Sequence, residues 1–138
     1  AFKANTNDTR ESAAITICKD LIEEGAILRI HDPKVTRSQI TNDLNLKEIK
    51  DSYQSEEKAN SYSDGSWTFF ENIMDSFEEV DAVVVLTEWE EYSTLDWDSI
   101  SEKMRTPGWV FDSRSIVSRK KVIDSGLRLW RIGDGFNN

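Results

Sequence analysis

The chain has 138 residues, of which 38% are hydrophobic and 31% are charged, and its formal net charge is −9. This composition is that of a globular protein with a real apolar core, and we expect one domain over residues 1–138. The acidity argues against nucleic acid or a membrane surface as a partner, because both require a positively charged surface. No apolar run approaches the ~20 residues that a membrane-spanning helix requires.

The single cysteine, Cys18, rules out an internal disulfide bond and indicates a reducing compartment such as the cytoplasm. The chain opens without a charged segment followed by an apolar one, so we expect no secretion signal. Its abrupt start at Ala1 indicates a piece cut from a longer protein.

The first twelve residues combine a predicted loop with two cations. Residues 5–9 are Asn, Asp and Thr, which compete for local backbone hydrogen bonds and therefore predict a loop. The helix that follows begins with unpaired amide groups and a partial positive charge, to which Lys3 and Arg10 add two formal charges. Such a place suits a phosphate group. An ordinary capped helix with two solvated cations is the alternative interpretation.

The next segment predicts a helix followed by a strand. Five apolar residues recur at helical spacing and form one stripe: Ala14, Ile17, Cys18, Leu21 and Ile22. Gly25 ends this helix, and residues 26–31 form a strand that ends at Asp32. Within the stripe, Cys18 is interpreted as a small buried hydrophobic residue rather than a nucleophile.

Two residues at the end of this strand are given structural roles. Asp32 stands where a ribose-binding acid would stand in a dinucleotide-binding domain, but the glycine-rich loop is absent, so we assign it a turn-capping role. His31 is the only histidine. It lacks recognisable partners for a metal site or a proton relay and is interpreted as structural.

The middle of the chain predicts a short helix over 37–46 and a polar surface loop over 47–65. A second helix is predicted to begin at a cap formed by residues 64–66, with an inward aromatic and apolar stripe at Trp67, Phe70, Ile73, Met74 and Phe77. Residues 81–87 then predict a strand. The four consecutive apolar residues at 83–86 indicate burial on both faces, which is typical of a parallel sheet covered by helices.

The remainder of the chain predicts a helix over 96–105, a short strand over 109–111, a basic helix over 118–124 and a last strand over 127–132. Helices and strands therefore alternate, which predicts an α/β domain with a mostly parallel sheet. The first strand of this sheet should immediately precede Ala1, so it is truncated here.

Four polar residues follow strands that are present or inferred: Lys3, Asp32, Thr87 and Arg114. Parallel strands all end at one edge of their sheet, where ligands bind near a topological switch point. We therefore expect these four side chains along one edge. Lys3 and Arg114 are the cations among them, and they support an anion site.

Four motifs carry a resemblance to a known family: AFKANTNDTRES at 1–12, IHDPKV at 30–35, DAVVVLTEW at 81–89 and FDSR at 111–114. In this order they resemble the C-terminal domain of the nucleotide-sugar 6-dehydrogenases (the UDP-glucose/GDP-mannose dehydrogenase family). The resemblance implies a Rossmann-like, three-layer domain that binds the UDP portion of a substrate. It also implies an enzyme that oxidises a sugar 6-hydroxyl to a carboxylate with two NAD⁺ per turnover.

The resemblance also implies individual roles. Phe2, Lys3 and Arg114 would contact the substrate, and Arg10 would reach the NAD side. The catalytic cysteine and the main NAD site belong to N-terminal and central domains, so the chain alone is expected to be inactive. The whole enzyme is expected to be a homo-oligomer in the cytoplasm.

The sequence departs from the family pattern near these residues. Ser113 replaces a frequent glycine, Ser115 a frequent second arginine, and Ala4 a lysine or proline. Because glycine permits a close approach, Ser113 bears on the geometry of the Arg114 contact.

Two other nucleotide-sugar substrates and one other class of protein are alternatives to this interpretation. The DTRES and TEW segments favour UDP-glucose, with UDP-glucuronate as the product, over GDP-mannose or UDP-N-acetylmannosamine. The other class is a non-enzymatic, receiver-like α/β module. A receiver needs an acidic pair after its first strand and a lysine after a later strand, and this sequence lacks both.

Overall fold

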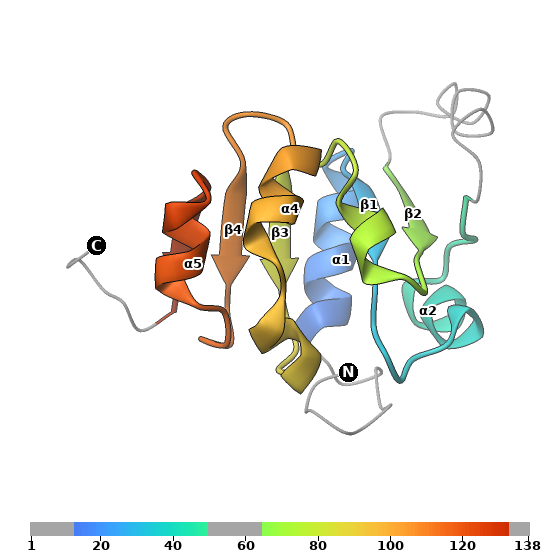
Figure 1. The fold of residues 1–138 in the computed structure, drawn as a ribbon. Coiled ribbons are helices and arrows are strands. Elements are labelled where there is room, and N and C mark those ends of the chain that lie inside the picture. The colour runs from blue at the N-terminus through green and yellow to red at the C-terminus, as the bar shows by residue number, and fades with distance from the viewer. Residues whose placement is uncertain (1–12, 50–64, 133–138) are drawn as a thin grey trace. The chain divides into compact units, whose positions relative to one another are not determined.

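The computed structural model describes residues 13–49 and 65–132 (Figure 1). These residues divide into two compact units, one ending at Ser76 and the other beginning at Phe77. Each unit combines helices with a sheet whose strands are all parallel. The predicted α/β class, of the Rossmann-like kind, is thereby confirmed. The truncated first strand and the single-domain assignment stay predictions.

Among residues 13–49 and 65–76, the first unit contains α1 (Ala13–Glu23), β1 (Ile27–Ile30), α2 (Arg37–Leu44), β2 (Ser66–Phe69) and most of the 3-10 helix η1 (Ile73–Phe77). The two strands pair in a register that sets Leu28 opposite Trp67. Helix α1 contacts both β1 and α2. The buried apolar side chains that hold these elements together include Ile22, Ile40, Leu44, Trp67 and Phe69.

Local sequence signals set the limits of both helices, and the helices predicted here are confirmed. Gly25 follows α1 with a φ of +92°, a conformation that glycine adopts without strain. At the start of α2, the Thr36 side chain accepts the Gln39 N–H, and the Gln39 side chain accepts the Thr36 N–H, which forms a capping box. No helix in the described ranges is long and apolar enough to cross a membrane.

The prediction of a helix beginning at residues 64–66 is wrong. Ser66–Phe69 form the strand β2, and helical backbone appears only at Ile73–Phe77, as the short 3-10 helix η1. Trp67 and Phe69 lie two residues apart, and both are buried. The aromatic side chains of Trp67 and Phe69 and the β-branched side chain of Thr68 favour the pleated backbone of a strand. This preference outweighs the apolar spacing that predicted a helix.

Gly65 explains why the strand begins where it does. A Cβ atom at this position would lie 1.8 Å from the carbonyl oxygen of Ala26. The Gly65 N–H donates to the carbonyl of Ile22 at 2.7 Å, and the Ser66 N–H donates to the carbonyl of Ala26 at 3.1 Å. Gly65 is therefore a point of close approach between two backbone segments, where only glycine fits.

Residues 77–132 of the second unit form β3 (Ala82–Val85), the 3-10 helix η2 (Glu90–Thr94), α4 (Trp97–Lys103), β4 (Trp109–Asp112), α5 (Arg119–Asp124) and β5 (Arg128–Arg131). The strands lie in the order β3-β4-β5. Asp96 caps α4, Ser118 caps α5, and Gly126 follows α5 with a φ of +95°. The strands and the two α-helices predicted over this range are confirmed.

The two faces of this sheet differ, which corrects the prediction of burial on both sides of the third strand. Figure 1 shows α4 and α5 on the same side of β3 and β4. Ile100 of α4 and Val122 of α5 are fully buried, as is Val110 of β4. In contrast, Val84 is 43% exposed and Phe111, opposite it in the register, is 37% exposed. Within the described part of this unit, both helices cover one face of the sheet, and the other face leaves Val84 and Phe111 exposed.

Replacing Gly65 tests the corrected strand assignment. We expect Gly65→Ala to lower the free energy of unfolding by about 3 kcal/mol, because the new methyl group would overlap the Ala26 carbonyl. Urea denaturation followed by tryptophan fluorescence measures this loss. If residues 64–66 began a helix instead, alanine would be neutral or would stabilise the protein by up to about 1 kcal/mol.

Candidate functional site

The carboxyl ends of β3 and β4 bring together two of the residues expected at one sheet edge. Thr87 follows β3 and Arg114 follows β4, and the two strands are parallel neighbours. Thr87 is buried, whereas 29% of the Arg114 side chain is exposed. Of this pair, only Arg114 can therefore present a charged group to a ligand.

Asp112, the last residue of β4, fixes the backbone that carries Arg114. Its side chain is fully buried and accepts three backbone N–H groups. Oδ1 accepts from Arg114 at 2.9 Å, and Oδ2 accepts from Ile116 at 2.7 Å and from Val117 at 2.9 Å. A buried carboxylate requires such donors, so the turn after β4 closes around it.

The two serines beside Arg114 tie the same turn to its surroundings. The N–H and the hydroxyl of Ser113 both donate to the carbonyl of Val85, at 3.1 and 2.7 Å. Ser115 has a φ of +57°, in the left-handed region, and its hydroxyl donates to the carbonyl of Ile132 at 2.6 Å. Arg114 therefore leaves the backbone between two anchored neighbours.

The guanidinium group of Arg114 is only partly satisfied. Its Nη2 lies 3.0 Å from Oε1 of Glu88, which forms an ion pair across the ends of the two strands. Its Nε is buried and has no hydrogen-bond partner within the described part of the chain. Arginine carries five N–H donors, so most of them are available to an oxyanion.

Of the other residues expected at this edge or given ligand contacts by the resemblance, the structure describes only Asp32. Phe2, Lys3 and Arg10 fall outside the described residues. Asp32 belongs to the first unit, where Oδ1 accepts the N–H groups of Lys34 at 2.9 Å and Val35 at 3.2 Å. Its predicted turn-capping role is confirmed, while the convergence of Lys3 and Asp32 with Arg114 stays a prediction.

Cys18 lies on the partly buried side of α1. Burial raises the pKa of its thiol to about 11, so the group is protonated at neutral pH. This supports its interpretation as an apolar packing residue rather than a nucleophile. No group of three or more His, Cys, Asp or Glu side chains in residues 13–49 and 65–132 is placed to hold a metal ion. The structural interpretation of His31 stays a prediction.

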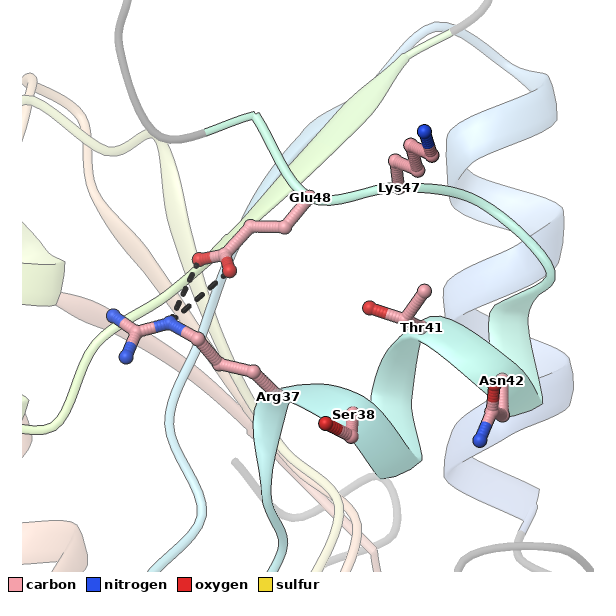
Figure 2. Close-up of a pocket in the computed structure, with 6 residues that line it drawn as sticks. All are labelled: Arg37, Ser38, Thr41, Asn42, Lys47 and Glu48. Carbon is pink, nitrogen blue, oxygen red and sulfur yellow. Dashed lines mark hydrogen bonds and ion pairs between the residues drawn. The ribbon is translucent and has the colours of Figure 1, made fainter.

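An open pocket of about 460 Å³ lies beside α2 and is lined by Arg37, Ser38, Thr41, Asn42, Lys47 and Glu48. Figure 2 shows the side chains of Arg37 and Glu48 pointing toward each other at one side of this pocket. The Glu48 carboxylate accepts from Arg37 Nε at 3.1 Å and from the Phe69 N–H at 2.6 Å. These contacts neutralise both charges and join the segment after α2 to β2, so we assign the pocket a structural role.

Glu88 and Asp112 are site residues to which the sequence analysis gave no role. The available signal for Asp112 was an acid at the end of an apolar strand, a frequent turn-capping residue. For Glu88 the signal was the Thr-Glu-Trp sequence after β3. Thr87 is 6% exposed and Trp89 is 4% exposed, whereas the Glu88 side chain is 45% exposed.

The structure is an α/β domain with a partly exposed arginine at the carboxyl edge of a parallel sheet, which is the edge where domains of this class bind their ligands. Comparison with known families agrees. Residues 1–119 match the model described as "UDP-glucose/GDP-mannose dehydrogenase family, UDP binding domain". The chain belongs to this family.

Three relatives illustrate the match. The chain is 38% identical over 133 residues to UDP-glucose 6-dehydrogenase of Drosophila melanogaster and 38% identical over 137 residues to that of Caenorhabditis elegans. It is 36% identical over 138 residues to UDP-glucose 6-dehydrogenase 4 of Arabidopsis thaliana. Each alignment covers 96% of this chain but only 26–28% of the relative. The chain thus spans about a quarter of the length of these relatives.

Removing the Asp112 carboxylate tests its role in the turn. We expect Asp112→Ala to lower the free energy of unfolding by about 3 to 5 kcal/mol, because three backbone N–H groups would lose a charged acceptor. Chemical denaturation gives this value. Glu102→Ala, at an exposed position of α4, is the control and should change stability by less than about 0.5 kcal/mol. A loss below about 1 kcal/mol at Asp112 would contradict the assignment.

Alkylation of the single cysteine tests the environment of Cys18. A pKa of about 11 in place of the ordinary 9.0 should make iodoacetamide react about 100-fold more slowly at pH 8 in the folded than in the unfolded chain. The stability that the protonated thiol contributes is fully present below pH 9 and is lost as the pH rises toward 11. Mass spectrometry across pH 7–10.5 measures the rate, and a midpoint near 9 would disprove the shift.

Proposed function

We propose that this chain binds the UDP portion of a UDP-sugar, with UDP-glucose as the substrate. We propose further that it acts as one domain of an NAD-dependent nucleotide-sugar 6-dehydrogenase. The family's UDP binding domain and the names of the relatives at 34–38% identity support this. In the whole protein, the sugar 6-hydroxyl would be oxidised to a carboxylate, with two NAD⁺ accepting one hydride each, and the product would be UDP-glucuronate.

The observation that carries the proposal is the Arg114 guanidinium at the end of β4. It is partly exposed, its backbone is held by Asp112, and one ion pair uses one of its donors. A pyrophosphate offers several oxygens to the remaining donors, and a planar guanidinium can bind two of them at once. We assign Arg114 to the substrate pyrophosphate.

The proposal extends to three residues near the start of the chain through the family resemblance. Lys3 would share the neutralisation of the pyrophosphate with Arg114, and Phe2 would provide an apolar contact near the nucleotide. Arg10 would reach toward NAD. These roles support a site in which several segments meet around one ligand.

The described residues do not fit NAD. Asp32 stands where a ribose-binding acid would be expected, yet its Oδ1 accepts two backbone N–H groups. Cys18, as a partly buried and protonated thiol, does not suit covalent catalysis. We therefore assign the main NAD site and the catalytic cysteine to N-terminal and central domains of a longer protein, and we expect this chain alone to be inactive.

The receiver-like alternative finds no support in the described residues. A receiver needs an accessible aspartate at a strand end to accept a phosphoryl group. Asp32 and Asp112 are both buried at strand ends, and both use carboxylate oxygens for backbone N–H groups. For the whole protein, we propose a homo-oligomer in the cytoplasm, as the resemblance implies.

Substitution of Arg114 tests the proposed ligand. We expect Arg114→Ala to weaken UDP binding at least tenfold, because the hydrogen bonds of a charged donor are lost. Arg114→Lys should recover part of the affinity, since an ammonium keeps the charge but not the planar fork. Isothermal titration of UDP and GDP gives the constants and tests nucleotide preference.

Arg105→Ala is the matched control, because it removes the same charge from an exposed side chain of the same unit. If Arg114→Ala and Arg105→Ala bind UDP equally well, Arg114 is not a ligand residue.

A further inference from the structure

The guanidinium group of Arg114 has one hydrogen-bonding neighbour among the described residues. Asp112 and the adjacent serines fix the backbone of Arg114, but their hydrogen bonds do not involve the guanidinium group, whose Nε is buried and whose side chain is 29% exposed. The one interaction that the guanidinium makes in the described part of the chain is the 3.0 Å contact between Nη2 and Oε1 of Glu88. An arginine side chain loses considerable rotamer entropy when it is held in place. A pre-formed contact therefore lowers the cost of ordering it around a ligand.

Glu88 is well placed to provide that contact. Its backbone lies between Thr87 and Trp89, which are 6% and 4% exposed and therefore firmly packed. Its side chain is 45% exposed and extends from the end of β3 toward the end of β4. The carboxylate thus projects from a rigid segment to a point beside the guanidinium, which is the geometry of an orienting group.

We propose that Glu88 is a positioning residue, which holds the Arg114 guanidinium in the orientation that receives a phosphate oxygen of the nucleotide ligand. This inference rests on the proposed UDP-binding role of Arg114. Glu88 uses one of the five guanidinium donors, the Nε–H is buried, and the remaining Nη donors are left to the ligand. It acts through Arg114 and makes no contact with the phosphate itself.

A carboxylate beside a phosphate site has two opposite effects, and substitutions can separate them. As a hydrogen-bond acceptor, Glu88 orders the arginine and favours binding. As a negative charge, it repels the phosphate and opposes binding. Glutamine keeps an acceptor oxygen on a side chain of the same length without the charge, whereas alanine removes both. The proposal therefore predicts that Glu88→Gln binds UDP at least as tightly as the natural protein and that Glu88→Ala binds it more weakly.

The experiment measures dissociation constants for UDP by titration calorimetry on the purified protein in its full natural length. Glu90→Ala serves as the charge control, because Glu90 is an exposed acid two residues away in η2. Exposed ion pairs are weak, so we expect Glu88→Ala to weaken binding about two- to fivefold relative to Glu90→Ala. Tighter binding by Glu88→Ala, or affinity equal to that of Glu90→Ala, would overturn the proposal.

A double-mutant cycle shows whether Glu88 acts through the arginine. In an Arg114→Ala background, Glu88→Ala should cause no further loss of affinity, because the group that it positions is gone. A loss of equal size in both backgrounds would indicate a general effect on the fold and would also overturn the proposal. Urea midpoints for each variant provide the corresponding check on folding.

The same data separate this inference from the proposed function. If Arg114→Ala leaves UDP binding unchanged, the ligand assignment fails and the positioning role fails with it. If Arg114→Ala weakens UDP binding, but Glu88→Ala binds UDP with the same affinity as Glu90→Ala, only the positioning role fails. A loss of UDP affinity in Arg114→Ala, a smaller loss in Glu88→Ala and no loss in Glu88→Gln would support both the ligand assignment and the positioning role.

Discussion

The buried carboxylate of Asp112 is the constraint on which the rest of the candidate site depends. A charge without exposure to water is tolerated only where hydrogen bonds replace its hydration, and here three backbone N–H groups do so. Those groups come from residues two, four and five positions later, so the chain must fold back around the carboxylate as soon as β4 ends. The point from which Arg114 leaves the backbone follows from this one requirement.

The charge of the whole chain says little about such a site. The net charge is −9, which argues against polyanionic partners, yet the proposed ligand is itself an anion. Exposed charges farther apart than about 8 Å are largely screened at physiological ionic strength. The groups that matter are therefore those in direct reach of the ligand. The guanidinium group of Arg114 forms an ion pair with Glu88, which balances its charge without occupying all of its donors.

Much of the fold could be predicted because its helices carry unambiguous local signals. Gly25, Asp96 and Ser118 mark ends of helices that the apolar spacing had already located. The strand β2 was missed because its apolar residues also fit helical spacing, and the contact that fixes where it begins joins Gly65 to the Ala26 carbonyl, 39 positions earlier. The pairing of Glu88 with Arg114 was also beyond the sequence, since it depends on the register of β3 with β4.

The serines beside Arg114 hold the turn after β4, although the family resemblance led us to expect a glycine at one of these positions. The left-handed φ falls on Ser115, while Ser113 directs its hydroxyl and its N–H to the carbonyl of Val85. A side chain at 113 therefore adds a hydrogen bond and does not force the backbone apart. The strain at Ser115 is offset by its bond to the carbonyl of Ile132. Because the turn is attached both to the end of β3 and to the residue after β5, the Arg114 backbone is held on both sides.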